Sequence, residues 1–296
     1  MARKETIFQG VATALITPMT EDGVNFDQYG RLIDWQIEQG INALVIAGTT
    51  GEGSTLTDEE HKACISYAVE RTAGRVPVIA GTGSNHTDYG KQLTKYAADA
   101  GADAALIVTP YYNKATQNGL VKIFEEYASV SDIPIIAYNV PGRTGVNIEP
   151  STYAKLAEID TVVAIKEANS NISKIVETFA LVGDKLDLYS GNDDQITPLL
   201  AMGAKGVISV LSNVVPAETV ELCDKFFAGD VAGSAALQCK YTEFVKDLFC
   251  EVNPIPVKEA MVLLGYCDPI IRSPLYRMEE QNLAKMKATM QELGII

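Results

Sequence analysis

Eight short apolar runs recur along the chain, and most are rich in β-branched side chains. The runs are continuous instead of alternating with polar residues, which is typical of strands buried on both faces of a parallel sheet. They predict strands at residues 13–18, 43–48, 77–83, 104–110, 134–141, 162–168, 187–193 and 206–213.

The segments between these runs carry helical signals. Thr57 and Glu60 have the spacing of a capping box at the start of a helix. Thr87 or Asp88 is a suitable cap for the next helix. Apolar residues recur at intervals of three and four, as in amphipathic helices, in residues 118–132 and 170–184.

Eight strand-then-helix units predict an α/β chain folded as a (β/α)8 TIM barrel. A doubly wound open sheet is the structural alternative, but the similar spacing of the runs favours closure, and no GxGxxG fingerprint follows the first run. After about residue 216 the strand pattern ends and helical segments follow. We therefore expect the barrel, with the active site, at residues 1–225 and a C-terminal helical domain at residues 226–296.

Composition and charge narrow the class of protein. The 296 residues are 47% hydrophobic, enough for a large core, and α/β barrels use chains of this length. A formal net charge of −14 argues against a nucleic-acid partner, because phosphate contacts need a basic face. Five scattered cysteines without a CxxC pair, together with no signal peptide and no membrane-spanning apolar stretch, predict a cytoplasmic protein with reduced thiols.

Catalytic groups of such barrels lie at the carboxyl ends of the strands and in the loops that follow them. The sixth run, TVVAIKEA, stops on Lys166, although lysine is rarely buried. Apolar surroundings disfavour the ammonium, so Lys166 can there present a neutral amine that attacks a carbonyl and forms a Schiff base. For a lysine taken alone, an ion pair with Glu167 at the rim of the sheet is the commoner arrangement.

Residues at the ends of neighbouring strands could act together with Lys166. Tyr138 closes the fifth run, where a phenol either relays protons or packs with a hydrogen-bonded hydroxyl. The second run continues into GTTGEG, which lacks the lysine of a P-loop and is either a tight turn or a loop whose N–H groups hold a carboxylate. Arg143 lies in a Pro/Gly-rich loop and is either solvated or the clamp for a second carboxylate.

The sequence lacks the residues that metal-dependent and serine-nucleophile enzymes need. His61 and His86 are the only histidines and stand in no metal-binding spacing, and no GxSxG nucleophile motif occurs. We therefore expect neither a metal nor a cofactor.

Motifs along nearly the whole chain resemble the dihydrodipicolinate synthases, within the N-acetylneuraminate lyase superfamily of Schiff-base aldolases. The matching stretches are GTTGEGSTL, VIAGTGSN, TPYYNK, YNVPGRTG, AIKEA, SGND, GVISV and NPIPVK. The resemblance implies a lyase that condenses pyruvate with L-aspartate 4-semialdehyde in the diaminopimelate route to lysine. GTTGE, with Arg-Thr-Gly after the proline, is closer to the synthases than to the sialic acid lyases.

The resemblance also implies roles for single residues. Lys166 would form the Schiff base with pyruvate, and Tyr138, Thr50 and Tyr112 would form a proton relay. Tyr112 would come from an adjacent subunit, because family members are usually homotetramers built from tight dimers. The implied substrate-binding residues are Thr49 and Thr50 for the pyruvate carboxylate, Arg143 for the carboxylate of the semialdehyde, and Gly191 and Ile208 for the lining of the pyruvate pocket.

Many members of the family are inhibited by lysine at the dimer interface. Asn85, His61 and Tyr111 match that site, whereas Tyr89 and Asp58 stand where sensitive members typically carry a Glu and a His. Loss of the Glu carboxylate removes the partner of the effector's amine, and the phenol fills space. We expect weak or absent inhibition by lysine.

Three alternatives remain to be compared with this function. A sugar-acid aldolase of the same superfamily would share Lys166, but Arg143 favours a small dicarboxylate-like partner. A non-catalytic barrel that binds a keto acid or acts as a scaffold would be expected to lack Lys166, Tyr138 or Thr50. A metal- or phosphate-dependent barrel needs a ligand cluster or a phosphate loop after the seventh and eighth runs, and SGND and ISVLSN provide neither.

Overall fold

The computed structural model describes residues 4–296 and contains a closed barrel of eight parallel strands. Its strands are β1 Gly10–Ala14, β4 Ala43–Ile46, β5 Val78–Gly81, β6 Ala104–Val108, β7 Ile135–Asn139, β8 Val162–Glu167, β9 Asp187–Ser190 and β10 Gly206–Ser209. Closure is complete because β1 pairs with both β4 and β10. The predicted TIM barrel is therefore confirmed, and the open-sheet alternative is wrong.

The first strand lies earlier than the sequence pattern indicated. It spans Gly10–Ala14, not residues 13–18, and it pairs Gly10 with Gly206. A Cβ on Gly206 would lie only 1.8 Å from the carbonyl oxygen of Gly10, so the two backbones approach where only glycine fits. A run of apolar side chains cannot reveal such a contact. The pattern also missed a small hairpin of β2 Met19–Thr20 and β3 Gly23–Val24.

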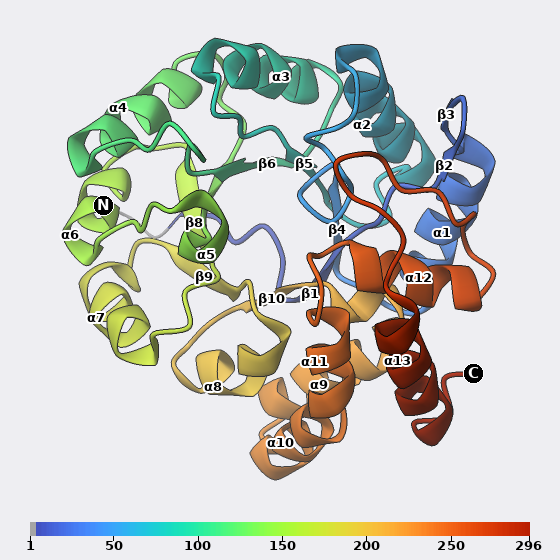
Figure 1. The fold of residues 1–296 in the computed structure, drawn as a ribbon. Helices are drawn as coiled ribbons and strands as arrows, with labels where there is room; N and C mark the ends of the chain where they lie inside the picture. Colours follow the sequence, from blue (N-terminus) through green and yellow to red (C-terminus); the bar gives the residue numbers. More distant parts are fainter. Residues whose placement is uncertain (1–3) are drawn as a thin grey trace.

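Helices surround the barrel in Figure 1, which looks into one end of it. The capping box predicted at Thr57 and Glu60 is present at the start of the second helix. The third helix begins after His86 without a side-chain cap, so the cap expected at Thr87 or Asp88 is wrong. The surrounding helices are α1 Phe26–Glu38, α2 Asp58–Thr72, α3 Thr87–Asp99, α4 Gln117–Ala128, α6 Pro150–Leu156, α7 Ile172–Val182 and α8 Ile196–Ala201. The short helix α5 Pro141–Thr144 lies inside this ring, in front of the strands (Figure 1), and two short 3-10 turns are η1 Asp193–Gln195 and η2 Leu211–Asn213.

The C-terminal helices gather beside β1 and β10 on one side of the barrel (Figure 1). They are α9 Pro216–Phe227, α10 Val231–Lys240, α11 Thr242–Leu248, α12 Ile255–Leu263 and α13 Glu280–Glu292. Helix α9 extends across residues 225 and 226, and the division of the chain into two domains at that point stays a prediction. In the described part of the chain, no helix has the length and apolar character to cross a membrane.

Small and large apolar side chains together fill the inside of the barrel. The inward cluster includes Ala12, Ala43, Ala104 and Ala164 together with larger residues from neighbouring strands. The outward side chains pack against the helices in two larger clusters, which together with the inward cluster bury both faces of the sheet.

Candidate active site

Lys166 lies in β8 on the same inward face as Ala164, because successive side chains of a strand point to opposite faces. Its register partner in β7 is Tyr138, which also belongs to the inward cluster. The ammonium nitrogen lies 4.3 Å from the centroid of the Tyr138 ring, and Lys166 is only 6% exposed. The barrel therefore holds amine and phenol side by side in a nearly water-free place.

Burial lowers the pKa of Lys166 to about 7, because the barrel interior solvates the ammonium poorly. Asp193 opposes this shift through its negative charge, and Arg143 adds to it. Within residues 4–296 the amine has no ion-pair partner. A large fraction of Lys166 is thus neutral near pH 7, as a nucleophilic amine requires.

The rim ion pair between Lys166 and Glu167 is absent from the structure. Glu167 points away from the barrel interior: its Oε1 accepts hydrogen bonds from Asn139 Nδ2 at 2.9 Å and from the Asn169 N–H at 2.8 Å, and its Oε2 accepts one from Tyr153 at 3.0 Å. Burial raises the pKa of Glu167 to about 7. The carboxylate therefore anchors β7 and the loop after β8 instead of neutralising the lysine.

The loop after β4 turns back on itself directly at the barrel mouth. Glu52 N–H donates to Thr49 O at 3.2 Å and Gly53 N–H to Gly48 O at 3.1 Å, and a Cβ on Gly53 would meet the Ala47 carbonyl oxygen at 2.1 Å. Thr49 is exposed and Thr50 is buried. The loop is a tight turn, and such a turn can also present backbone N–H groups to an anion.

Arg143 lies in the short helix α5, which follows directly from β7 through Pro141. Its side chain is exposed, and its Nη2 donates to the main-chain oxygen of Asn253 at 3.1 Å. The guanidinium is thereby held at the mouth of the barrel, with donors left over for a carboxylate.

A cavity of about 510 Å³ opens between these elements. Thr49, Tyr138 and Arg143 line one part of it. Another part is lined by four of the five residues compared with the lysine-inhibition site, namely Asp58, His61, Tyr89 and Tyr111. The fifth, Asn85, donates from Nδ2 to Tyr111 O at 3.2 Å. The expectation of weak lysine inhibition stays a prediction.

The remaining predicted residues fall into two groups. Gly191 and Ile208 lie at the barrel end: Gly191 N–H donates to Glu167 O at 2.7 Å, and Ile208 belongs to the buried inward cluster. A Cβ on Gly191 would come within 2.9 Å of Ala168 Cβ, so this position requires the smallest residue. Tyr112 is not brought to Lys166 within this chain, and its side chain is 91% exposed.

Two buried residues of the site, Asp193 and Asn253, are not among those predicted from the sequence. Asp193 accepts hydrogen bonds from Ser209 Oγ at 2.6 Å and from the N–H groups of Val210 and Leu211, both at 2.9 Å, and so fixes the end of β10. Asn253 donates from Nδ2 to Thr50 Oγ1 at 3.0 Å. Both residues stand in motifs quoted above, SGND and NPIPVK, but their partners are distant in sequence.

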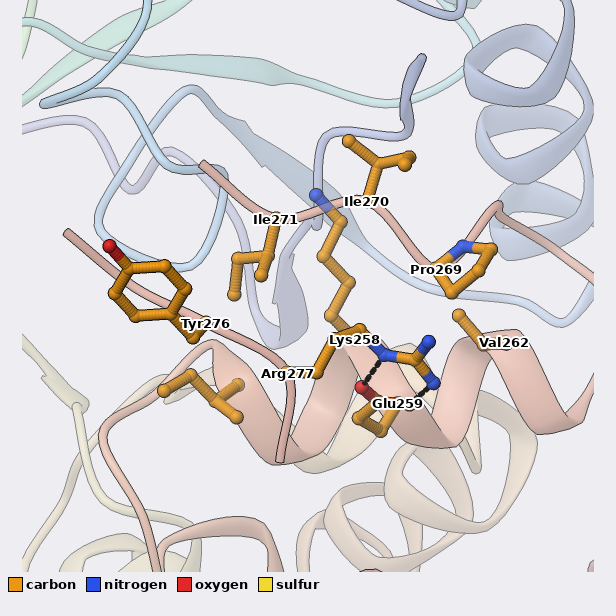
Figure 2. A pocket seen from close by; sticks show the side chains of 9 residues that line it. Lys258, Glu259, Val262, Pro269, Ile270, Ile271, Tyr276 and Arg277 are labelled. Atoms are coloured by element: carbon orange, nitrogen blue, oxygen red, sulfur yellow. Dashed lines mark hydrogen bonds and ion pairs between the residues drawn. The ribbon is translucent and has the colours of Figure 1, made fainter. Parts of the chain in front are cut away.

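A second cavity lies between α12 and residues 269–277, lined among others by Lys258, Glu259 and Arg277 (Figure 2). Its volume of about 10 Å³ is no more than a single water needs, so it cannot hold a substrate. Among residues 4–296, no three or more His, Cys, Asp or Glu side chains are grouped as metal ligands.

Comparison with known proteins assigns the family. Residues 7–293 match the model of the dihydrodipicolinate synthetase family. The chain belongs to this family. A 4-hydroxy-tetrahydrodipicolinate synthase of Acetivibrio thermocellus is 51% identical over 293 residues, which cover 99% of this chain and 100% of that protein.

Solved structures of the dihydrodipicolinate synthetase family have the same fold. The enzyme of Aquifex aeolicus has a TM-score of 0.95 and 44% identity, over 97% of this chain and 99% of that one. A chloride-inhibited enzyme of Acinetobacter baumannii, complexed with pyruvate, has a TM-score of 0.96 and 43% identity, over 98% of this chain and 100% of that one. Family membership makes the chain a lyase of the class I aldolase type that serves lysine biosynthesis.

Proposed function

We propose that the chain joins pyruvate to L-aspartate 4-semialdehyde through a Schiff base on Lys166. The observation that carries this proposal is the buried Lys166 amine beside the Tyr138 ring, at the end of an otherwise apolar strand. The 4-hydroxy-tetrahydrodipicolinate synthase activity of the 51% identical relative supports the choice of reaction.

The first half of the proposed reaction charges the lysine. The neutral amine of Lys166 adds to the keto carbon of pyruvate, and the resulting carbinolamine loses water once its oxygen is protonated. Tyr138 can deliver and recover that proton, because burial raises its pKa to about 12 and keeps the phenol protonated. The N–H groups of the Thr49–Thr50 turn would hold the pyruvate carboxylate meanwhile.

The second half uses the Schiff base as an electron sink. Loss of a proton from the pyruvate methyl group gives an enamine, whose carbon attacks the aldehyde carbon of the semialdehyde and leaves an alkoxide to be protonated. The amino group of the semialdehyde would then add to the regenerated imine carbon and expel the Lys166 amine, which frees the lysine for the next cycle. Arg143 would bind the carboxylate of this second substrate, and Gly191 and Ile208 would line the pyruvate pocket. Thr50 and Tyr112 would complete the proton relay, with Tyr112 coming from another subunit.

The proposal includes a homotetramer built from dimers in the cytoplasm. The exposure of Tyr112 supports the assembly. A tyrosine side chain that acts in the relay must be enclosed in an active site, and a neighbouring subunit would enclose this one.

Borohydride reduction in the presence of pyruvate, followed by peptide mass spectrometry, tests the proposal. We expect a reduced pyruvyl adduct on Lys166 alone, and none in the Lys166→Ala variant. Assays with pyruvate plus the semialdehyde, and with N-acetylneuraminate, then separate the synthase from a sugar-acid lyase. An adduct that persists in Lys166→Ala would overturn the assignment of the nucleophile.

A further inference from the structure

Asn253 connects two residues of the proposed site from the C-terminal part of the chain. It lies just before α12 and is 5% exposed. Its side-chain Nδ2 donates to Thr50 Oγ1 at 3.0 Å, and its main-chain oxygen accepts from Arg143 Nη2 at 3.1 Å. Thr50 is 203 positions away in sequence and Arg143 is 110, so only the fold brings the three together.

The hydrogen bond to Thr50 has a direction, and the direction matters for a proton relay. A threonine hydroxyl has one proton to donate and two lone pairs to accept with. The Asn253 amide N–H group can only donate, so it occupies a lone pair of Thr50 Oγ1 and leaves the hydroxyl proton to be donated elsewhere. Asn253 thereby selects the orientation in which Thr50 acts as a donor.

Both partners of this hydrogen bond are held rigidly. Glu52, two residues after Thr50, forms an ion pair with Lys258 of α12, and the two side chains are 1% and 4% exposed. The second Glu52 oxygen accepts the Arg272 N–H at 3.0 Å. Figure 2 shows Lys258 extending away from α12 beside Ile270 and Ile271. The loop of Thr50 and the start of α12 are thus fixed against each other.

We propose that Asn253 is a positioning residue that orients the Thr50 hydroxyl, so that the C-terminal helices complete the proton relay of the barrel. The inference rests on the proposed function, because it takes Thr50 to be a member of the relay. It assigns Asn253 no contact with substrate and no proton of its own.

A double-mutant cycle on Asn253 and Thr50 tests this role. Asn253→Ala should lower kcat by about 10- to 100-fold, within the range of proton-transfer contributions. The KM for the semialdehyde should stay within about twofold, because Arg143 contacts the main chain of Asn253, which the substitution leaves in place. In the Thr50→Val background, Asn253→Ala should lower kcat no further, since the hydroxyl it orients is already gone.

Matched variants separate positioning from folding. Asn118→Ala removes an exposed amide of α4, whose Oδ1 accepts a hydrogen bond from Lys155 Nζ at 3.3 Å, and should leave kcat unchanged. If Asn253→Ala does not fold, Asn253→Asp takes its place in the cycle, because the aspartate keeps the size but offers Thr50 no N–H donor. Thermal unfolding of each variant shows whether the native fold is retained.

Two outcomes would overturn the inference. One is a folded Asn253 variant whose kcat is within twofold of that of the parent. The other is a double variant whose loss of kcat equals the product of the losses in the two single variants. The borohydride adduct of the parent chain reports separately on the proposed function. If the parent chain forms the adduct on Lys166 but the Asn253 and Thr50 substitutions act independently on kcat, only the positioning role is wrong. If the parent chain forms no adduct, the proposed Schiff-base function itself is wrong.

Discussion

At the scale of single residues, two consecutive side chains of β8 have opposite environments. Lys166 points into the barrel beside Tyr138, whereas Glu167 points outward into hydrogen bonds with Asn139, Asn169 and Tyr153. Strand alternation separates the amine from the carboxylate that follows it. Burial then lowers the pKa of Lys166, and the negative charge of Asp193 offsets that effect only in part. The lowered pKa of Lys166, the proposed nucleophile, therefore follows from where the strand places its side chains.

The lowered pKa of Lys166 predicts the acid limb of the pH profile. The ammonium cannot attack pyruvate, so kcat/KM for pyruvate should fall as the pH drops through about 7, and well below that by about tenfold per pH unit. Initial rates over a pH series at subsaturating pyruvate measure this. Because the pKa of Glu167 is also near 7, the Glu167→Gln variant is the control and should keep the same midpoint. A limb that vanishes in that variant would contradict the assignment to Lys166.

At the scale of elements, the loop after β4 and helix α12 are joined by a buried ion pair. Glu52 and Lys258 are almost completely excluded from water, and Arg272 adds a main-chain hydrogen bond to the same carboxylate. A buried pair gains little net stability over apolar residues but is costly to break, because one charge is left uncompensated. The pair thus fixes the geometry of the Thr49–Thr50 turn more than it stabilises the fold.

Lys258→Ala should lower the free energy of unfolding by about 3–5 kcal/mol, because it leaves the Glu52 carboxylate buried without its partner. Chemical denaturation followed by circular dichroism measures the loss. Lys246→Ala is the matched control: it removes a lysine from an ion pair with Glu243 whose side chains are 62% and 64% exposed, and it should change stability little. Equal denaturation midpoints for the two variants would contradict the prediction.

At the scale of the whole molecule, one chain does not contain the complete proposed relay. Lys166, Tyr138 and Thr50 lie at the barrel mouth, but Tyr112 is exposed on the loop after β6. Its backbone has a φ of 71°, in the left-handed region that a tyrosine rarely adopts. A partner subunit that receives the Tyr112 side chain would account for both its exposure and its place in the relay.

Mixed oligomers test that arrangement. Lys166→Ala and Tyr112→Phe chains, each of low activity, should recover activity when they are dissociated, mixed and reassembled. A mixed dimer has one site with a native lysine and a native partner tyrosine, so about a quarter of all sites should be native after random pairing. Mixing Lys166→Ala with Tyr138→Phe is the control and should restore nothing, because those two residues belong to the same chain. Equal recovery in both mixtures would contradict a shared site.

The sequence by itself determined the barrel and the position of Lys166, the proposed nucleophile, at the end of a strand. Continuous runs rich in β-branched residues favour strands that are buried on both faces. Eight such strands, with helices between them, form the closed barrel. The end of a run marks the barrel mouth, so the sequence alone predicts that Lys166, Tyr138 and Arg143 lie near one another. These are local signals, carried by residues adjacent in the chain.

Only the tertiary structure decided which partners hold these residues. The hydrogen bond of Asn253 to Thr50, the ion pair of Lys258 with Glu52 and the approach of Gly10 to Gly206 each join residues about 200 positions apart. No hydrophobic period encodes such contacts, because they depend on how the closed barrel presents its loops to the C-terminal helices. The chain pattern supplies the reacting groups, and the packing of distant segments sets their orientation.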